Sequence, residues 1–118
     1  MEIARNAELP VLPLVDGIVV RPVVGKRLNI QEVTLEPGAT APTHTHHEEQ
    51  LGYVVSGEID FTDGQKTWRL GPGDFYYAPS GAPHGATALE SGSVVIDAFS
   101  PPREQVVKML AERELFGS

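Results

Sequence analysis

Short apolar runs separated by turn residues fill the first 100 residues of the chain. The runs lie at residues 18–20, 28–35, 51–55, 59–61, 68–70, 75–78 and 94–99. Turn signals lie between them at Pro37-Gly38, Ser56-Gly57, Asp63-Gly64, Gly71-Pro72-Gly73, Pro79-Ser80-Gly81 and Ser91-Gly92. Many short strands at a spacing of roughly ten residues predict an all-β sandwich or barrel. Within this pattern, Thr62-Asp63-Gly64-Gln65 predicts a tight hairpin whose two central residues take positive φ.

One helix is expected, and it comes last. Pro101 and Pro102 suit a helix entry, and Glu104 follows in the first turn, where the helix dipole favours negative charge. The predicted helix covers about residues 102–116. Its apolar stripe consists of Val106, Val107, Leu110 and Leu115, with Met109 beside it. We expect this stripe to pack against the barrel or against a second subunit.

Length and charge narrow the function classes. A chain of 118 residues fits one domain, expected to span residues 1–118. It contains no cysteine, which excludes disulfides, thiolate metal sites and a cysteine nucleophile. The formal charge of −7 argues against a nucleic-acid partner, although it leaves room for a small anionic ligand at a local positive site. No apolar run is long enough to span a membrane, and the first ten residues lack a signal-peptide layout, so a cytoplasmic location is expected.

Three of the four histidines lie in the segment Thr43-His44-Thr45-His46-His47-Glu48-Glu49-Gln50, and the fourth is His84. On a regular strand His44 and His46 would point to the same face, because side chains alternate. Glu48 and Gln50 share their parity, so either could be a further ligand. Imidazoles with an amide or a carboxylate suit a divalent transition metal such as nickel, zinc, manganese or iron. The residues alone leave the choice between Glu48 and Gln50 open.

A second segment with fixed spacing runs from Gly73 to His84. Together the two segments resemble the paired motifs of the cupin superfamily, G-x5-H-x-H-x3,4-E-x6-G and G-x5-P-x-G-x2-H-x3-N. The matching residues are Gly38, His44, His46, Gln50 and Gly57 in the first motif (38–57), and Gly73, Pro79, Gly81, His84 and Ala88 in the second (73–88). The resemblance implies a double-stranded β-helix, or jelly roll, with His44, His46, Gln50 and His84 as metal ligands. Gln50 replaces the usual glutamate, which would leave the metal more electrophilic and more attractive to an anionic ligand. Ala88 replaces the usual asparagine, a change that we interpret as structural.

Asp97 interrupts the apolar run 94–99. Its parity groups it with Val95 and Phe99, and because both faces of the run are largely apolar, we expect the carboxyl to be sheltered. A buried carboxylate must be paired, neutralised or functional, so Asp97 is a candidate acid or base. Taken from the residues alone, it could equally be a solvent-facing edge residue. Phe99 alone suggests core packing, and Arg103 is a poor match for a helix start, which favours a specific partner.

The late stretch also resembles KdgF-type cupins, which linearise unsaturated monouronates in pectin and alginate breakdown. That resemblance implies a site of three histidines and a glutamine, with Asp97, Phe99 and Arg103 as catalytic residues and a small anionic sugar as substrate. Asp97 would transfer the proton, Phe99 would form an apolar wall, and Arg103 would orient Asp97 or bind the substrate carboxylate. Two alternatives stay open: a cupin dioxygenase, and a metal-containing binding module without catalysis.

Several residues have no assigned place from sequence alone. Tyr53, Trp68, Tyr76 and Tyr77 could line a sugar pocket or pack in the core, and Arg27 and Gln31 could face inward. A homodimer is expected, because the apolar, proline-containing segment 9–24 is typical of an edge strand, and a second subunit could cover that exposed edge. The same segment could instead fold back on its own barrel.

Overall fold

The computed structural model describes residues 1–115, in which β-strands predominate and one α-helix follows them. A short 3-10 helix, Asn6–Glu8, comes before the strands. The strands are β1 (Leu12–Val15), β2 (Ile18–Val24), β3 (Asn29–Leu35), β4 (Thr40–His44), β5 (Glu49–Thr62), β6 (Thr67–Leu70), β7 (Phe75–Ala78) and β8 (His84–Ser100), and the helix is α1 (Glu104–Leu115). The all-β prediction with a C-terminal helix is therefore confirmed.

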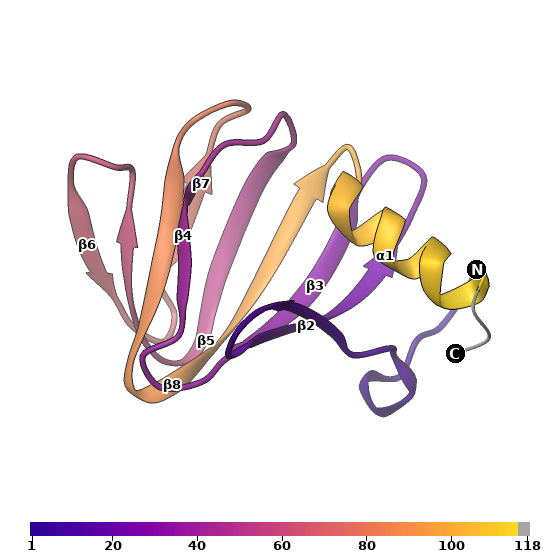
Figure 1. The fold of residues 1–118 in the computed structure, drawn as a ribbon, viewed down its shortest axis with the longest axis horizontal. Coiled ribbons are helices and arrows are strands. Elements are labelled where there is room, and N and C mark those ends of the chain that lie inside the picture. The colour runs from indigo at the N-terminus through magenta and orange to yellow at the C-terminus, as the bar shows by residue number, and fades with distance from the viewer. Residues whose placement is uncertain (116–118) are drawn as a thin grey trace.

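Two long strands, β5 and β8, form the centre of the fold. They pair with each other in antiparallel register, and the strand order around them is β1-β2-β3-β8-β5-β6. β4 pairs with β8, and β7 pairs with β5. Figure 1 shows β4, β6 and β7 on one side and β2 and β3 on the other, with the two sides meeting along β5 and β8 at the bottom of the view and α1 beside β2 and β3. This is the expected jelly-roll arrangement, which opens at the end where β4 and β8 bring their histidines.

Two of the predicted turns are bends inside these long strands. Ser56-Gly57 lies within β5 and Ser91-Gly92 within β8, so the separate strands expected at 51–55 and 59–61 are one strand. Both glycines take positive φ, 73° at Gly57 and 70° at Gly92. A Cβ on Gly57 would lie 2.0 Å from the carbonyl oxygen of Gly92. The glycines therefore let two paired strands bend together, which a sequence pattern cannot distinguish from a chain reversal.

The hairpin between β5 and β6 is confirmed, but its geometry differs from the expectation. Gly64 takes a φ of 95°, whereas Asp63 keeps a negative φ. The loop is instead held by the Asp63 carboxylate, whose Oδ1 accepts hydrogen bonds from the backbone N–H groups of Gln65 and Lys66 at 2.9 and 2.8 Å. An Asx-type contact thus replaces the predicted two-residue turn.

The C-terminal helix begins two residues later than predicted, at Glu104, and it packs on its own barrel. Val106 is fully buried in the core, and Met109 and Leu110 pack against that core. Val107 is 40% exposed, so the prediction that it belongs to the buried stripe is wrong, because the next residue along a helix points about 100° away. Residue 116 and the side chain of Leu115, both included in the prediction, lie outside what the structure describes.

The N-terminal segment 9–24 folds back on its own barrel, as the second of the two predicted alternatives has it. β1 pairs with β2 and β2 with β3, and the side chains of Leu12, Ile18 and Val20 are buried in the chain's own core. Among the described residues, no helix combines the length and the apolar character needed to cross a membrane.

Candidate metal centre and active site

Three histidine side chains converge at the open end of the barrel. His44 ends β4, His84 begins β8, and the two face each other in the β4–β8 register. His46 joins them from the segment between β4 and β5, and one ring nitrogen from each of the three lies within 4.8 Å of the others. Among the described residues this is a group that could hold a metal ion, which agrees with the expectation for these three positions.

Each of these imidazoles is oriented by a backbone carbonyl. Nδ1 of His44 lies 2.8 Å from the carbonyl oxygen of Pro42, Nδ1 of His84 lies 2.9 Å from that of Ala82, and Nδ1 of His46 lies 3.0 Å from that of Glu48. Since a carbonyl only accepts, each Nδ1 carries the proton and donates it. In neutral imidazoles the lone pairs then lie on Nε2, which is the arrangement that a metal ligand needs.

The Nε2 atoms approach other acceptors closely. Nε2 of His46 lies 3.1 Å from Nε2 of His84 and 3.1 Å from Oε1 of Gln50. A spacing of about 3 Å is what neighbouring ligands show around a divalent ion about 2.1 Å away. Burial lowers the pKa of both His46 and His84, which favours the neutral, metal-ligating form. The donor set therefore fits a divalent transition metal, with Gln50 placed to complete it.

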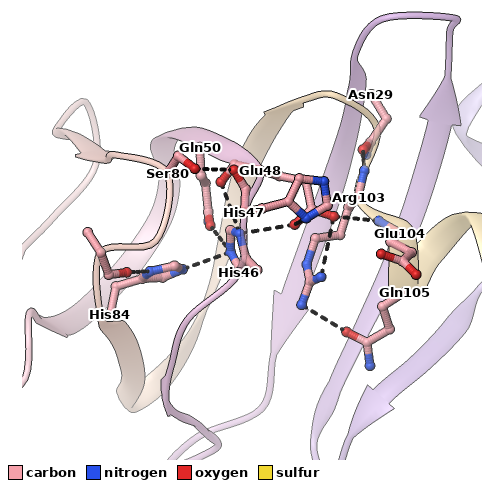
Figure 2. A network of polar contacts seen from close by, with 11 residues as sticks. Asn29, His46, His47, Glu48, Gln50, Ser80, His84, Arg103, Glu104 and Gln105 are labelled. Carbon is pink, nitrogen blue, oxygen red and sulfur yellow. Dashed lines mark hydrogen bonds and ion pairs between the residues drawn. The ribbon is translucent and has the colours of Figure 1, made fainter.

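Glu48, the competing candidate ligand, lies on the outer side of His46, next to Nδ1 and away from the converging Nε2 atoms. Its carboxylate faces the start of α1, where Oε2 accepts a hydrogen bond from the backbone N–H of Glu104 at 2.6 Å (Figure 2). The parity argument for Glu48 does not apply, because the segment between β4 and β5 is not a strand and alternation stops there. Gln50, inside β5, is 6% exposed and faces the histidines.

A cavity of about 410 Å³ extends from the histidines into the barrel. Its wall includes Gln50, Asp97, Phe99 and Arg103, so the structure brings the predicted catalytic residues and the predicted ligands to one space. Phe99 is 5% exposed, and its ring lies 5.7 Å from that of His46. Gln31 also lines the cavity, whereas Arg27 is exposed and does not.

Asp97 is a buried acid in this wall. Burial raises its pKa from the usual 3.8 to about 6, although hydrogen bonds with Tyr76 and Gln50 oppose the rise. The Tyr76 hydroxyl donates to Oδ1 of Asp97 at 2.5 Å, and burial together with the neighbouring carboxylate raises the pKa of Tyr76 well above 10. Asp97 is therefore a carboxyl that can hold or release a proton close to neutral pH.

Tyr76 lines the cavity, one of the two places expected for it, but its contact with Asp97 has no local sequence signal of its own; a glycine explains how the ring reaches that residue. Gly52 is the register partner of both Tyr76 on β7 and Asp97 on β8, and a Cβ at Gly52 would lie 2.0 Å from the Tyr76 ring. The ring thus crosses β5 at the position where no side chain stands. A glycine inside an apolar strand was the available signal for such a close approach. Of the other aromatic residues considered, Tyr53, Trp68 and Tyr77 are exposed and do not line the cavity.

Arg103 lies at the edge of the cavity with its side chain 18% exposed. Its guanidinium group lies 3.6 Å from Oε2 of Glu48 and donates to Oε1 of Gln105 at 3.4 Å. In the described part of the chain, no hydrogen bond or ion pair joins it to Asp97. Of the two roles considered for Arg103, this placement favours binding an anionic ligand over orienting Asp97.

Comparisons with known proteins agree with the fold. A family model described as "Cupin domain" matches residues 31–98. Pectin degradation protein KdgF of Dickeya dadantii is 41% identical over 68 residues, which are 56% of this chain and 61% of that protein. Oxalate decarboxylase OxdC of Bacillus subtilis is 33% identical over 81 residues, 64% of this chain and 21% of that protein. The matched segments therefore span less than two thirds of either curated relative.

Solved structures match over most of the chain. KdgF from Halomonas sp. superposes with a TM-score of 0.82 at 35% identity, covering 90% of this chain and 98% of that one. An RmlC-like cupin from Shewanella frigidimarina gives a TM-score of 0.84 at 25% identity, covering 90% and 96%. Similarity to KdgF and to oxalate decarboxylases favours an enzyme. This protein belongs to the cupin family and is a KdgF-like member of it.

Proposed function

We propose that this protein is a metal-dependent isomerase that converts unsaturated monouronates, of the kind released in pectin or alginate breakdown, to linear keto-uronates. The observation that carries the proposal is a buried carboxyl, Asp97, in the wall of the same cavity as the histidine cluster. The similarity to two KdgF proteins supports the substrate class. A cavity of about 410 Å³ suits one small ligand such as a single sugar.

His44, His46, Gln50 and His84 would hold a divalent transition metal. The bound metal would supply Lewis acidity, which stabilises negative charge that develops on substrate oxygens. All four ligands are neutral, so the site keeps a net positive charge that attracts an anionic sugar. Arg103 adds a second cation at the cavity edge, where its planar fork can bind a carboxylate.

The reaction is an isomerisation in which the substrate releases one proton and takes up one proton. The hemiacetal hydroxyl of the substrate loses its proton and the bond between the anomeric carbon and the ring oxygen breaks, which gives an aldehyde and an enol-type oxygen. Carbon four then takes up one proton, and the enol becomes a ketone. No oxidant, reductant or organic cofactor is consumed.

Asp97 transfers the proton to carbon four. Its raised pKa allows a protonated carboxyl to be present near neutral pH and to be restored after transfer. The Tyr76 hydroxyl fixes the orientation of the carboxyl by donating to Oδ1. Phe99 provides an apolar wall that shields the cavity from water.

The test is the addition of zinc-loaded protein to unsaturated galacturonate while the loss of the conjugated ultraviolet absorbance is followed. We expect turnover in the wild type and a decrease of about 10²–10⁴-fold in Asp97→Asn, the range typical of a positioned acid or base. Asp60→Asn is the matched control, because Asp60 lies on β5, bonds to Arg69 and does not line the cavity. Equal rates for the protein and for buffer would overturn the proposal.

Two further measurements distinguish the alternatives. A dioxygenase would need oxygen and a redox-active metal, so undiminished turnover under anaerobic conditions with zinc excludes it. A binding module would bind the sugar without any turnover. In that case Asp97→Asn would leave both affinity and absorbance unchanged.

A further inference from the structure

Glu48 is a buried carboxylate that the proposed reaction does not use. Its side chain is 1% exposed and lies in the segment between β4 and β5. A buried carboxylate is costly unless charged or polar groups surround it. Figure 2 shows it between the histidines on one side and the start of α1 on the other. Each of its two oxygens faces one of these sides.

Oε1 faces the metal ligand His46. It lies 3.3 Å from Nδ1 of His46, the nitrogen that also donates to the Glu48 carbonyl at 3.0 Å. Among the described residues this oxygen has no hydrogen-bond partner that meets normal geometry. A second nitrogen nearby is Nδ1 of the exposed His47, at 3.6 Å. Among the described residues, Nδ1 of His44 and Nδ1 of His84 each have only a backbone carbonyl as a partner. His46 is therefore the one ligand of the three whose outer nitrogen faces a negative charge.

Oε2 faces the start of α1. It accepts a hydrogen bond from the backbone N–H of Glu104 at 2.6 Å and lies 3.6 Å from Nη1 of Arg103. The backbone N–H of Arg103 donates in turn to Oδ1 of Asn29, a buried residue of β3, at 2.6 Å. Free N–H groups at a helix start need such acceptors, and these two come from distant parts of the chain. The backbone position of Arg103 is thus fixed by Glu48 and Asn29 together.

The charge of Glu48 fits both contacts. Its surroundings favour the charged form, because the backbone N–H of Glu104 donates to Oε2 and the guanidinium group of Arg103 lies 3.6 Å from the same oxygen. Its carboxylate form is therefore the form that faces His46 and α1. A carboxylate beside the outer nitrogen of a ligating imidazole makes the imidazole a stronger donor to the metal.

We infer that Glu48 is a positioning residue that acts on both halves of the site: it strengthens His46 as a metal ligand and fixes Arg103 where an anionic ligand would bind. The first half concerns metal binding alone. The second half rests on the proposed function, because it concerns the binding of the uronate carboxylate.

The first experiment measures zinc affinity by competition with a chelator, with no sugar present. Glu48→Gln keeps the size of the side chain and an acceptor for the Glu104 N–H but removes the charge. We expect its zinc affinity to fall by about 10–100-fold, the range seen when an outer partner of a ligating histidine is lost. Glu49→Gln is the control, since it makes the same change one residue later, at an exposed side chain that bonds to Tyr77. Equal zinc affinities in Glu48→Gln and Glu49→Gln would overturn the inference.

A second variant covers the case in which Glu48→Gln does not fold. Glu48→Asp keeps the charge but is one methylene shorter, so it cannot reach His46 and Glu104 together. We expect an intermediate loss of zinc affinity, and an affinity equal to that of the wild type would contradict the inference. Circular dichroism of each variant shows whether the barrel is intact.

The second experiment separates the two halves through KM. Asn29→Ala removes the acceptor of the Arg103 N–H without touching His46, so we expect a raised KM for unsaturated galacturonate and an unchanged zinc affinity. Glu48→Gln should change both quantities. If Asn29→Ala and Glu48→Gln both leave KM unchanged, the Arg103 half is wrong. If the wild type shows no turnover, the proposed function fails, while the zinc measurements still decide the first half.

Discussion

Replacing Asp97 by asparagine should stabilise the metal-free protein although it slows the proposed reaction. The carboxyl is buried, and burial penalises its charged form, which is why its pKa is raised to about 6 in the folded chain. Asparagine has nearly the same shape, carries no charge and still accepts a hydrogen bond from Tyr76. The variant therefore removes the cost of burying a charged carboxylate and keeps the packing of the side chain.

The size and sign of the effect follow from linkage between protonation and folding. Between the unfolded value of 3.8 and the folded value of about 6, the folded chain holds the extra proton, so the wild type loses stability as pH rises through this window. At 1.36 kcal/mol for each pH unit, the loss reaches about 3 kcal/mol and stays constant above pH 6. The asparagine variant does not undergo this loss. Its free energy of unfolding should equal that of the wild type at pH 4 and exceed it by about 3 kcal/mol at pH 8.

Urea unfolding in the presence of a chelator, at several pH values between 4 and 8, measures this difference. Asp60→Asn is a control in which the change in stability should have the opposite sign, because the hydrogen bond from Arg69 lowers the pKa of the half-buried Asp60. That variant should lose a little stability near neutral pH and none in acid. The reasoning is refuted if Asp97→Asn is no more stable than the wild type at pH 8, or if its advantage does not change with pH.

Three further predictions concern other parts of the structure. Gly52→Ala should lower the free energy of unfolding by about 1–3 kcal/mol, because its Cβ would overlap the Tyr76 ring; an unchanged urea midpoint would contradict this. Zinc at 100 times its Kd should stabilise the wild type by about 2.7 kcal/mol in thermal unfolding and His84→Ala much less, so equal shifts in both proteins would argue against the proposed ligands. The homodimer stays a prediction, and the outer sheet face offers a surface for it, since Leu51 and its register partner Tyr77 are 56% and 53% exposed there. Leu51→Asp should then lower the molar mass measured by light scattering, whereas a mass equal to that of the wild type would count against this surface.

Sequence reasoning reached the architecture and the candidate site because both depend on local patterns. Turn residues at regular spacing indicated the strands, and fixed motif spacing singled out His44, His46 and His84, which the structure brings together. Alternation also grouped Asp97 with Val95 and Phe99, and all three are buried because β8 is regular there. The same rule made Glu48 a competing ligand, although alternation does not hold there because its segment is not a strand.

What sequence could not supply were contacts between distant segments. Tyr76 meets Asp97 only because β7 and β8 flank β5 at Gly52, and that adjacency is a property of the sheet order. The roles of Gly57 and Gly92 depend on their facing each other across two strands. Glu48 and Asn29 act on α1 through space, so neither residue carries a local signal of this role.

The long β5–β8 ladder ties the chemistry of the site to the folding of the whole chain. Gln50, Asp97 and Phe99 lie on this ladder, and His44 meets His84 only after β4 has joined β8. Pairings between segments so far apart in sequence give a high contact order, which makes folding slow. The amide hydrogens of Gln50 and Asp97, inside this ladder, should therefore exchange with solvent only through global opening, whereas the amide of His46, outside any strand, should exchange sooner. A metal held by His44, Gln50 and His84 together would therefore bind only after β4, β5 and β8 have paired.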